Sequence, residues 1–290
     1  MKIPGESVEF YVRTGWYVSD LVIAGDIVDE CIAAAERIYR CQYDRTQPWS
    51  ASPHIGNYNR EYADRTRLRV DQFPSFHSDA LKKVVHSPEI AALAAQLLRT
   101  DEIRYYKDIL IGTPTRGGQS AIGWHTDISY WPTCVAERMI TVYVPLQDRD
   151  QHNGTLLMIE GSQRWASRAF NISAEFDELD RLKKRYEAQG HRVELHPLPH
   201  RKGQVSFHSS MVVHATYPNT TDEFQHSIVF GLQARDNRFV PSPMKRLDPS
   251  VVVNLNDEIG PRLPDGTPDI KNDDFYPVLY SEPGAGRGGS

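Results

Sequence analysis

The chain has few cysteines, no dense run of basic residues and no long apolar stretch, and each absence excludes a class of protein. Three cysteines in 290 residues are too few, and of the wrong parity, for a disulfide framework, and they lack the paired spacing of a structural zinc site. A net charge of −5 without a basic run argues against nucleic acid as a partner. No segment reaches the ~20 apolar residues that cross a bilayer, and the opening sequence MKIPGESVEF lacks the apolar core of a signal peptide. We therefore expect a cytoplasmic protein that binds a small molecule rather than nucleic acid or a membrane.

Apolar periodicity predicts helices first and short strands afterwards. Residues 26–40, 78–99 and 176–186 carry apolar side chains at helical spacing. Short apolar runs of strand length cover 103–111, 123–130, 139–146, 155–160, 204–207, 212–215 and 227–234. Asn153-Gly154 between two of these runs predicts a hairpin, because both residues tolerate positive φ.

This order of elements predicts a single domain over residues 1–282 that is mainly β with flanking helices. The N-terminal helices would occupy about 26–100 and the β core about 103–240. Polar residues 43–67 are expected to form a long loop that reaches over a site. The glycine-rich residues 283–290 are expected to be a disordered tail.

A candidate metal site begins at the sequence Gly-Trp-His-Thr-Asp. His125 and Asp127 stand two residues apart in a predicted strand, so their side chains would share a face. His214, at the end of another apolar run, is the best candidate for a third ligand. Two histidines and one carboxylate form the facial triad of non-haem iron(II) oxygenases, which leaves positions open for a cosubstrate and dioxygen. Zinc could occupy the same set of ligands with one open position.

The other histidines compete for these roles. His208 is an even number of residues from His214, so it would share its face in a regular strand. We expect it behind the ligands or in the core rather than on the metal. His191, His196 and His200 lie in a polar linker and are expected to be solvated.

Four motifs, in order, resemble the phytanoyl-CoA dioxygenase family. They are WHTDISYWP at 124–132, the apolar run at 139–146, NGTLLMIEGS at 153–162, and a segment at 203–219 that opens GQVSFH and closes in Pro-Asn. The family has WHxDxxYW, a strand, NGxLxxxPGSH and GDxxxFHxxxxHxxxPN, and the resemblance spans about residues 8–235.

This resemblance implies a double-stranded β-helix core, which is a jelly-roll or cupin-like fold. It also implies a dioxygenase that uses iron(II), 2-oxoglutarate and O2 to oxidise a C–H bond of a small molecule. The outcome would be hydroxylation, desaturation, cyclisation or epimerisation, and many relatives act on secondary metabolites.

The resemblance also assigns residues. Its metal ligands match the two histidines and the aspartate named above. Tyr143 falls where members often carry a tryptophan beside 2-oxoglutarate, and Thr216 falls where a hydroxyl can hydrogen-bond that cosubstrate. Candidate substrate-lining residues are Trp124, Tyr130 and Trp131.

One position departs from the family pattern. Where the family usually has an arginine that binds the far carboxylate of 2-oxoglutarate, this chain has Gln225. An amide lacks both the charge and the bidentate fork of a guanidinium. Another cation would have to replace it, and the candidates are Lys107, Arg235 and His226. The departure leaves other possibilities open: a different oxoacid, a metal-dependent isomerase or hydrolase, or a non-catalytic jelly-roll binding protein.

Overall fold

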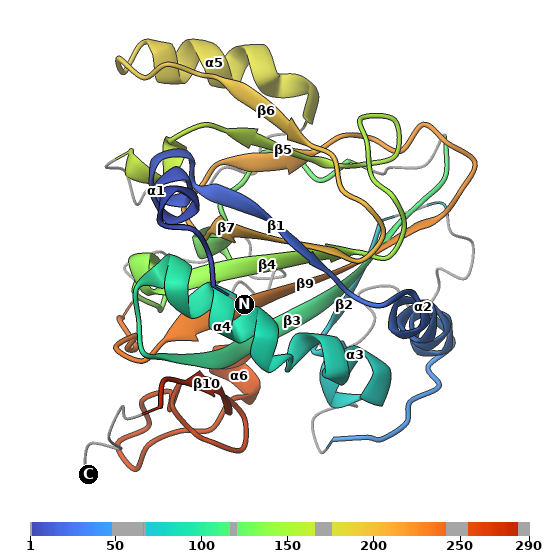
Figure 1. The fold of residues 1–290 in the computed structure, drawn as a ribbon, viewed down its shortest axis with the longest axis vertical. Coiled ribbons are helices and arrows are strands. Elements are labelled where there is room, and N and C mark those ends of the chain that lie inside the picture. The colour runs from blue at the N-terminus through green and yellow to red at the C-terminus, as the bar shows by residue number, and fades with distance from the viewer. Residues whose placement is uncertain are drawn as a thin grey trace.

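The computed structural model describes residues 2–47, 66, 68–116, 121–165, 176–241 and 255–283. Its strands form two antiparallel sheets (Figure 1). The seven-stranded sheet has the order β1 (Trp16–Val22), β7 (Gln204–Ser209), β4 (Met139–Pro145), β9 (Gln225–Ala234), β3 (Glu102–Thr113) and β10 (Val278–Ser281), with β2 (Arg69–Gln72) also paired to β3. The three-stranded sheet has the order β6 (Leu195–Leu198), β5 (Leu156–Ile159) and β8 (His214–Thr216).

The chain passes repeatedly between the two sheets, as a double-stranded β-helix requires. From β3 it crosses to His125, which is bridged to His214 of β8, and returns to the larger sheet in β4. It then forms β5 and β6 in the smaller sheet, β7 in the larger, β8 in the smaller and β9 in the larger. The predicted jelly-roll core is confirmed.

Helices cover the outer faces of this core. They are α1 (Gly5–Thr14), α2 (Gly25–Tyr39), α3 (Asp79–Val85), α4 (Pro88–Leu98), α5 (Leu179–Glu187) and α6 (Leu255–Ile259). α4 packs on β3, β4 and β9 (Figure 1), and it begins with Ser87 as an N-cap that accepts a hydrogen bond from the Ile90 amide. Leu182 and Tyr186 of α5 are buried against apolar residues of β5 and β8.

Short 3-10 turns link these elements. They lie at Pro74–Phe76, Asp127–Ser129, Ala136–Arg138, Ser162–Arg164 and Phe176–Glu178. No helix in the described part of the chain is long and apolar enough to span a membrane.

The predicted helices at 26–40, 78–99 and 176–186 are present, and the second is divided into α3 and α4. β6 was not predicted, because its sequence LHPL is short and contains proline, which an edge strand tolerates. The expectation that His200 is solvated is wrong. It is 4% exposed, and its Nε2 lies 2.8 Å from the Ser206 hydroxyl.

The predicted strand at 123–130 is also wrong. The chain makes isolated bridges at Trp124 and His125 and then turns into the 3-10 helix that Asp127 begins. In this turn the Ser129 amide donates to the Thr126 carbonyl at 3.1 Å and the Tyr130 amide donates to the Asp127 carbonyl at 2.9 Å, so these backbone groups are not available to a ladder. The predicted strand at 212–215 is shifted, and His214 begins β8 rather than ending it.

Two predictions fall largely outside the described residues. They concern most of the polar loop (48–65 and 67) and the tail from 284 to 290.

Candidate metal centre

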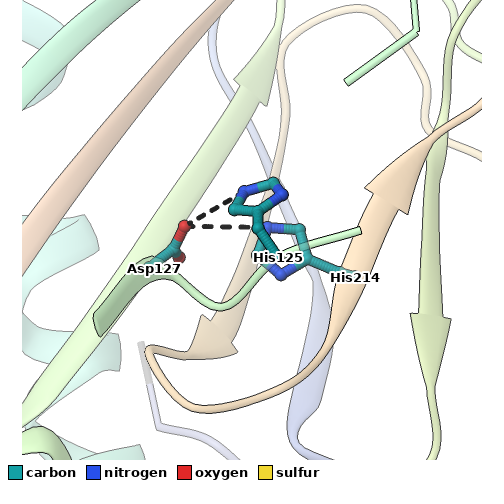
Figure 2. Close-up of side chains that lie close together, drawn as sticks. All are labelled: His125, Asp127 and His214. Atoms are coloured by element: carbon teal, nitrogen blue, oxygen red, sulfur yellow. Dashed lines mark ion pairs between the residues drawn. The ribbon is translucent and has the colours of Figure 1, made fainter. Parts of the chain in front are cut away.

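Three side chains converge on one point between the sheets. His125, Asp127 and His214 present ligand atoms that all lie within 4.8 Å of one another. The Oδ1 atom of Asp127 is 3.7 Å from the Nε2 atoms of both histidines (Figure 2). These separations are too long for hydrogen bonds and suit three ligands around a shared cation. The sequence therefore predicted this convergence correctly, although it placed the first two residues in a strand that does not form.

Backbone carbonyls fix which nitrogen of each histidine faces the centre. The Nδ1 atom of His125 lies 2.8 Å from the Gly123 carbonyl, and Nδ1 of His214 lies 3.0 Å from the Val212 carbonyl. Because a carbonyl only accepts, each Nδ1 carries the proton and each Nε2 keeps its lone pair. Both lone pairs are therefore available to a metal before any metal binds.

The second carboxylate oxygen of Asp127 is held by two neighbours. Its Oδ2 accepts a hydrogen bond from the Thr141 hydroxyl at 2.5 Å and lies 2.9 Å from Nε2 of His208. Such partners orient a ligand and are part of most metal sites. The remaining atom, Oδ1, is the one that faces the histidines. His208 thus stands behind a ligand, as expected, although it and His214 lie in different sheets rather than on one face of a single strand.

The charge states suit metal binding at neutral pH. Burial lowers the pKa of His214 to about 3, so this imidazole is neutral and can donate its lone pair. Burial alone would raise the pKa of Asp127, but the imidazoles of His214 and His208 outweigh this effect and hold the pKa well below its usual range. Two imidazole nitrogens and one carboxylate oxygen form the donor set that iron(II) accepts.

The centre opens into a cavity of about 280 Å³ between the inner faces of the two sheets. Its walls are largely apolar, with Val70, Ile109, Ile111 and Val229 among them. Such a cavity takes a small ligand and excludes water from it. Most of the polar groups that line it lie at two ends, which we call the metal end and the far end.

The metal end is marked by one row of paired residues across the larger sheet. In this row Lys107 is opposite Gly231, Gly231 is opposite Thr141, and Thr141 is opposite His208. Lys107 lines the cavity, and its Nζ lies 5.7 Å from the Trp131 ring and 5.9 Å from the Phe73 ring. Burial lowers the pKa of Lys107 to about 8.

The far end is formed by Tyr143, Thr216, Ser227 and Gly154, all of which line the cavity. Ser227 lies on the same face of β9 as Gly231 but four residues earlier in the strand, away from the row that marks the metal end. Immediately behind Ser227 and Gly154 lies Arg149, from the turn between β4 and β5. No sequence motif pointed to this residue.

Several other predicted site residues can now be placed. Tyr130 and Trp131 line the cavity, but Trp124 is fully buried in a separate apolar cluster. Gln225 is 1% exposed and is not among the described residues that line the cavity.

Two of the three candidate replacement cations lie away from the cavity. His226 stacks on Tyr39, with 5.8 Å between the ring centroids, and its Nε2 lies 3.5 Å from Glu36. Arg235 pairs with Asp101 at the surface at 2.8 Å.

The jelly roll and its buried set of two histidines and one carboxylate define the class of facial-triad metalloproteins. The chain belongs to the phytanoyl-CoA dioxygenase (PhyH) family, whose sequence model matches residues 11–227. The predicted family is confirmed.

The chain is also similar to individual proteins in sequence and to solved structures in fold. Ectoine dioxygenase of Nocardia farcinica is 24% identical over 168 residues, which are 56% of this chain and 52% of that protein, so the match spans about half the relative's length. The carbocyclase SnoK from nogalamycin biosynthesis superposes with a TM-score of 0.68 at 18% identity, over 96% of both chains. The epimerase SnoN, solved with Fe3+, alpha-ketoglutarate and nogalamycin RO, superposes with a TM-score of 0.66 at 17% identity, over 94% of this chain and 97% of the other.

Proposed function

We propose that this protein is an iron(II)- and 2-oxoglutarate-dependent dioxygenase that oxidises a C–H bond of a small, largely apolar molecule. The observation that carries this proposal is the position of Asp127 Oδ1, 3.7 Å from the lone-pair nitrogens of His125 and His214, in the wall of an apolar cavity. Membership of a dioxygenase family supports it.

The ligand assignment is part of the proposal. His125, Asp127 and His214 would hold the iron on one side and leave its other positions facing the cavity. Bound iron would supply the activation of dioxygen, with 2-oxoglutarate as the source of electrons. The chain orients both ligands and keeps water out of the space between the sheets.

The remaining residues of the cavity would bind the cosubstrate and the substrate. Tyr143 and Thr216, at the far end, would receive the cosubstrate, and Tyr130 and Trp131 would contact the substrate. Lys107 has no carboxylate within ion-pair distance among the described residues, although it lines the cavity at the metal end. A buried ammonium without a carboxylate is costly, so we propose that Lys107 meets an anionic group of a bound ligand.

The substrate class is proposed from the cavity and from the relatives together. SnoK and SnoN come from nogalamycin biosynthesis, which agrees with a secondary metabolite as the substrate. The apolar lining favours a molecule whose reacting part is hydrocarbon. The cytoplasmic location stays a prediction.

The test is to purify the protein without oxygen, add iron(II) and 2-oxoglutarate, and record the visible absorption of the chelate. We expect a charge-transfer band with one iron per chain, and succinate and CO2 once oxygen is admitted. If zinc supports an oxygen-independent reaction and no band forms, the protein is an isomerase or hydrolase. If no metal binds in stoichiometric amount, it is a binding protein.

A further inference from the structure

A buried guanidinium with unused donors lies immediately behind Ser227 and Gly154 at the far end of the cavity. Arg149 is 2% exposed. Its Nη1 donates to the Asn153 carbonyl at 2.6 Å, and its Nη2 donates to the His226 carbonyl and the Ser227 hydroxyl, both at 3.1 Å. A guanidinium has five N–H donors. These bonds use three of them, and the Nε donor is buried without a partner.

The positive charge of Arg149 is also uncompensated. No carboxylate of the described residues forms an ion pair with it, and the ionisable groups that act on it are the phenols of Tyr143 and Tyr39. Burial lowers the pKa of Arg149, which shows that the charge is held at a cost. A buried charge is normally paired, so the missing partner is expected to be an anion that binds there.

Hydroxyl groups at the far end point to the same kind of ligand. The Ser227 hydroxyl accepts from Arg149 and donates to the Tyr143 hydroxyl at 3.5 Å. The hydrogen of the Tyr143 hydroxyl is therefore free for an incoming acceptor. Thr216 lines the cavity nearby, and its oxygen accepts from the Ile122 amide at 2.8 Å, which leaves its hydrogen free as well. A guanidinium with two hydroxyl donors is a site for a carboxylate.

Gly154 leaves room for this arrangement. It has a φ of +92°, and a Cβ there would lie 3.3 Å from Nη1 of Arg149. The glycine that the Asn-Gly turn requires therefore also clears the space between the guanidinium and the cavity.

We infer that Arg149 binds the far carboxylate of 2-oxoglutarate, and so replaces the arginine that the family pattern places at position 225. This inference rests on the proposed function, because it assumes that a 2-oxo diacid chelates the iron. It extends that function by assigning the recognition of the diacid to Arg149. This residue lies in the turn between β4 and β5, whereas the family pattern places the arginine in β9.

The other cations do not fit this role. Arg235 and His226 are engaged away from the cavity, with Asp101 and Glu36 respectively. Lys107 lies in the row of Thr141 and His208 at the metal end, four residues along β3 from Ile111, which is paired with Ser227 at the far end.

The experiment compares two cosubstrates in the iron-loaded protein without oxygen. 2-Oxoglutarate has the far carboxylate, and 2-oxobutanoate is a 2-oxo acid without it. Dissociation constants come from titration of the charge-transfer band. We expect Arg149→Gln to weaken 2-oxoglutarate about 10- to 100-fold, the range for a hydrogen bond to a charged group, and to leave 2-oxobutanoate unchanged.

Two further variants distinguish the loss of a contact to the carboxylate from a general disturbance of the fold. The double variant Arg149→Gln/Gln225→Arg moves the guanidinium to the family position and is expected to recover most of the affinity for 2-oxoglutarate. Arg149→Lys keeps the charge without the fork, so it should lose part of the preference for the diacid. It also serves if Arg149→Gln does not fold.

The outcomes separate the two proposals. If Arg149 variants weaken both acids equally, or leave 2-oxoglutarate unaffected, the inference about Arg149 is overturned while the dioxygenase proposal stands. If neither acid produces a band with the iron-loaded wild-type protein, the proposed function fails first.

Discussion

The two ends of the cavity differ in how they are built. At the metal end, two ligands come from one short segment, and backbone carbonyls of neighbouring residues orient both histidines. At the far end, Tyr143, Thr216, Ser227 and Arg149 come from four separate parts of the jelly roll. The orientation of the two histidines therefore depends on local sequence, whereas the far end depends on which strands lie beside one another.

The two ends also differ in how their charges are balanced. Asp127 is surrounded by donors even before a metal binds, from Thr141 and His208. Arg149 keeps a buried charge without a carboxylate. We conclude that the metal end is preorganised by the protein, while the far end is completed only by its ligand. The following predictions test this difference, beginning with the largest expected effect.

Removing a ligand at the metal end should abolish the site. In His214→Ala we expect iron affinity to fall by at least about 100-fold, because even residues behind metal ligands contribute 10–100-fold. The measurement is iron content after anaerobic dialysis. His152→Ala, at an exposed histidine in the turn before β5, is the control and should bind iron normally. Stoichiometric iron in His214→Ala would show that the triad is misassigned.

Removing the contact between His208 and Asp127 should lower iron affinity at the metal end and leave cosubstrate preference at the far end unchanged. His208→Ala takes away a hydrogen bond to Asp127 Oδ2, and we expect iron affinity to fall about 10- to 100-fold. The preference for 2-oxoglutarate over 2-oxobutanoate, measured at saturating iron, should not change. A changed preference would mean that the two ends are coupled and that the metal end is not preorganised independently of the far end.

Losing one hydroxyl at the far end should have a smaller effect. Thr216→Val keeps the shape and removes a neutral donor, so we expect 2-oxoglutarate affinity to fall about 2- to 10-fold. Thr220→Val is the control, since that hydroxyl is bonded at the surface to the His152 carbonyl. Equal loss of affinity for 2-oxobutanoate would place the Thr216 contact at the other end of the cosubstrate.

The pH dependence separates Arg149 from Lys107. Lys107 has a pKa of about 8 because burial outweighs the nearby carboxylates of Asp108 and Asp127 and the Cys134 thiol, so it carries its charge below that pH and loses it above. Arginine stays protonated throughout. With Arg149 as the anchor, the preference for 2-oxoglutarate over 2-oxobutanoate should be unchanged across this range. A preference that disappears as pH rises through about 8 would assign the far carboxylate to Lys107.

Much of the fold could be predicted because its elements carry local signals. The apolar stripe of α2 and the capped start of α4 both appear in short windows of sequence. The hairpin predicted at Asn153-Gly154 is wrong, because the strands on either side of this turn, β4 and β5, lie in different sheets and do not pair with each other. The strand predicted around His125 failed because the amides of Ser129 and Tyr130 bond the carbonyls of Thr126 and Asp127 and turn the chain, an effect that periodicity does not show. β6 was missed because a four-residue edge strand that contains proline resembles a linker.

The sequence by itself determined the family, the jelly-roll core and the three residues that converge at the metal end, because each rests on a spacing within one motif or on the order of motifs. Only the tertiary structure decided the far end. It buries His226 against Tyr39, keeps Arg235 at the surface and brings Arg149 behind Ser227, residues 78 positions apart in the chain. The physical reason is that pairing between β4 and β9 sets this contact, and a register between distant strands leaves no local trace in the sequence.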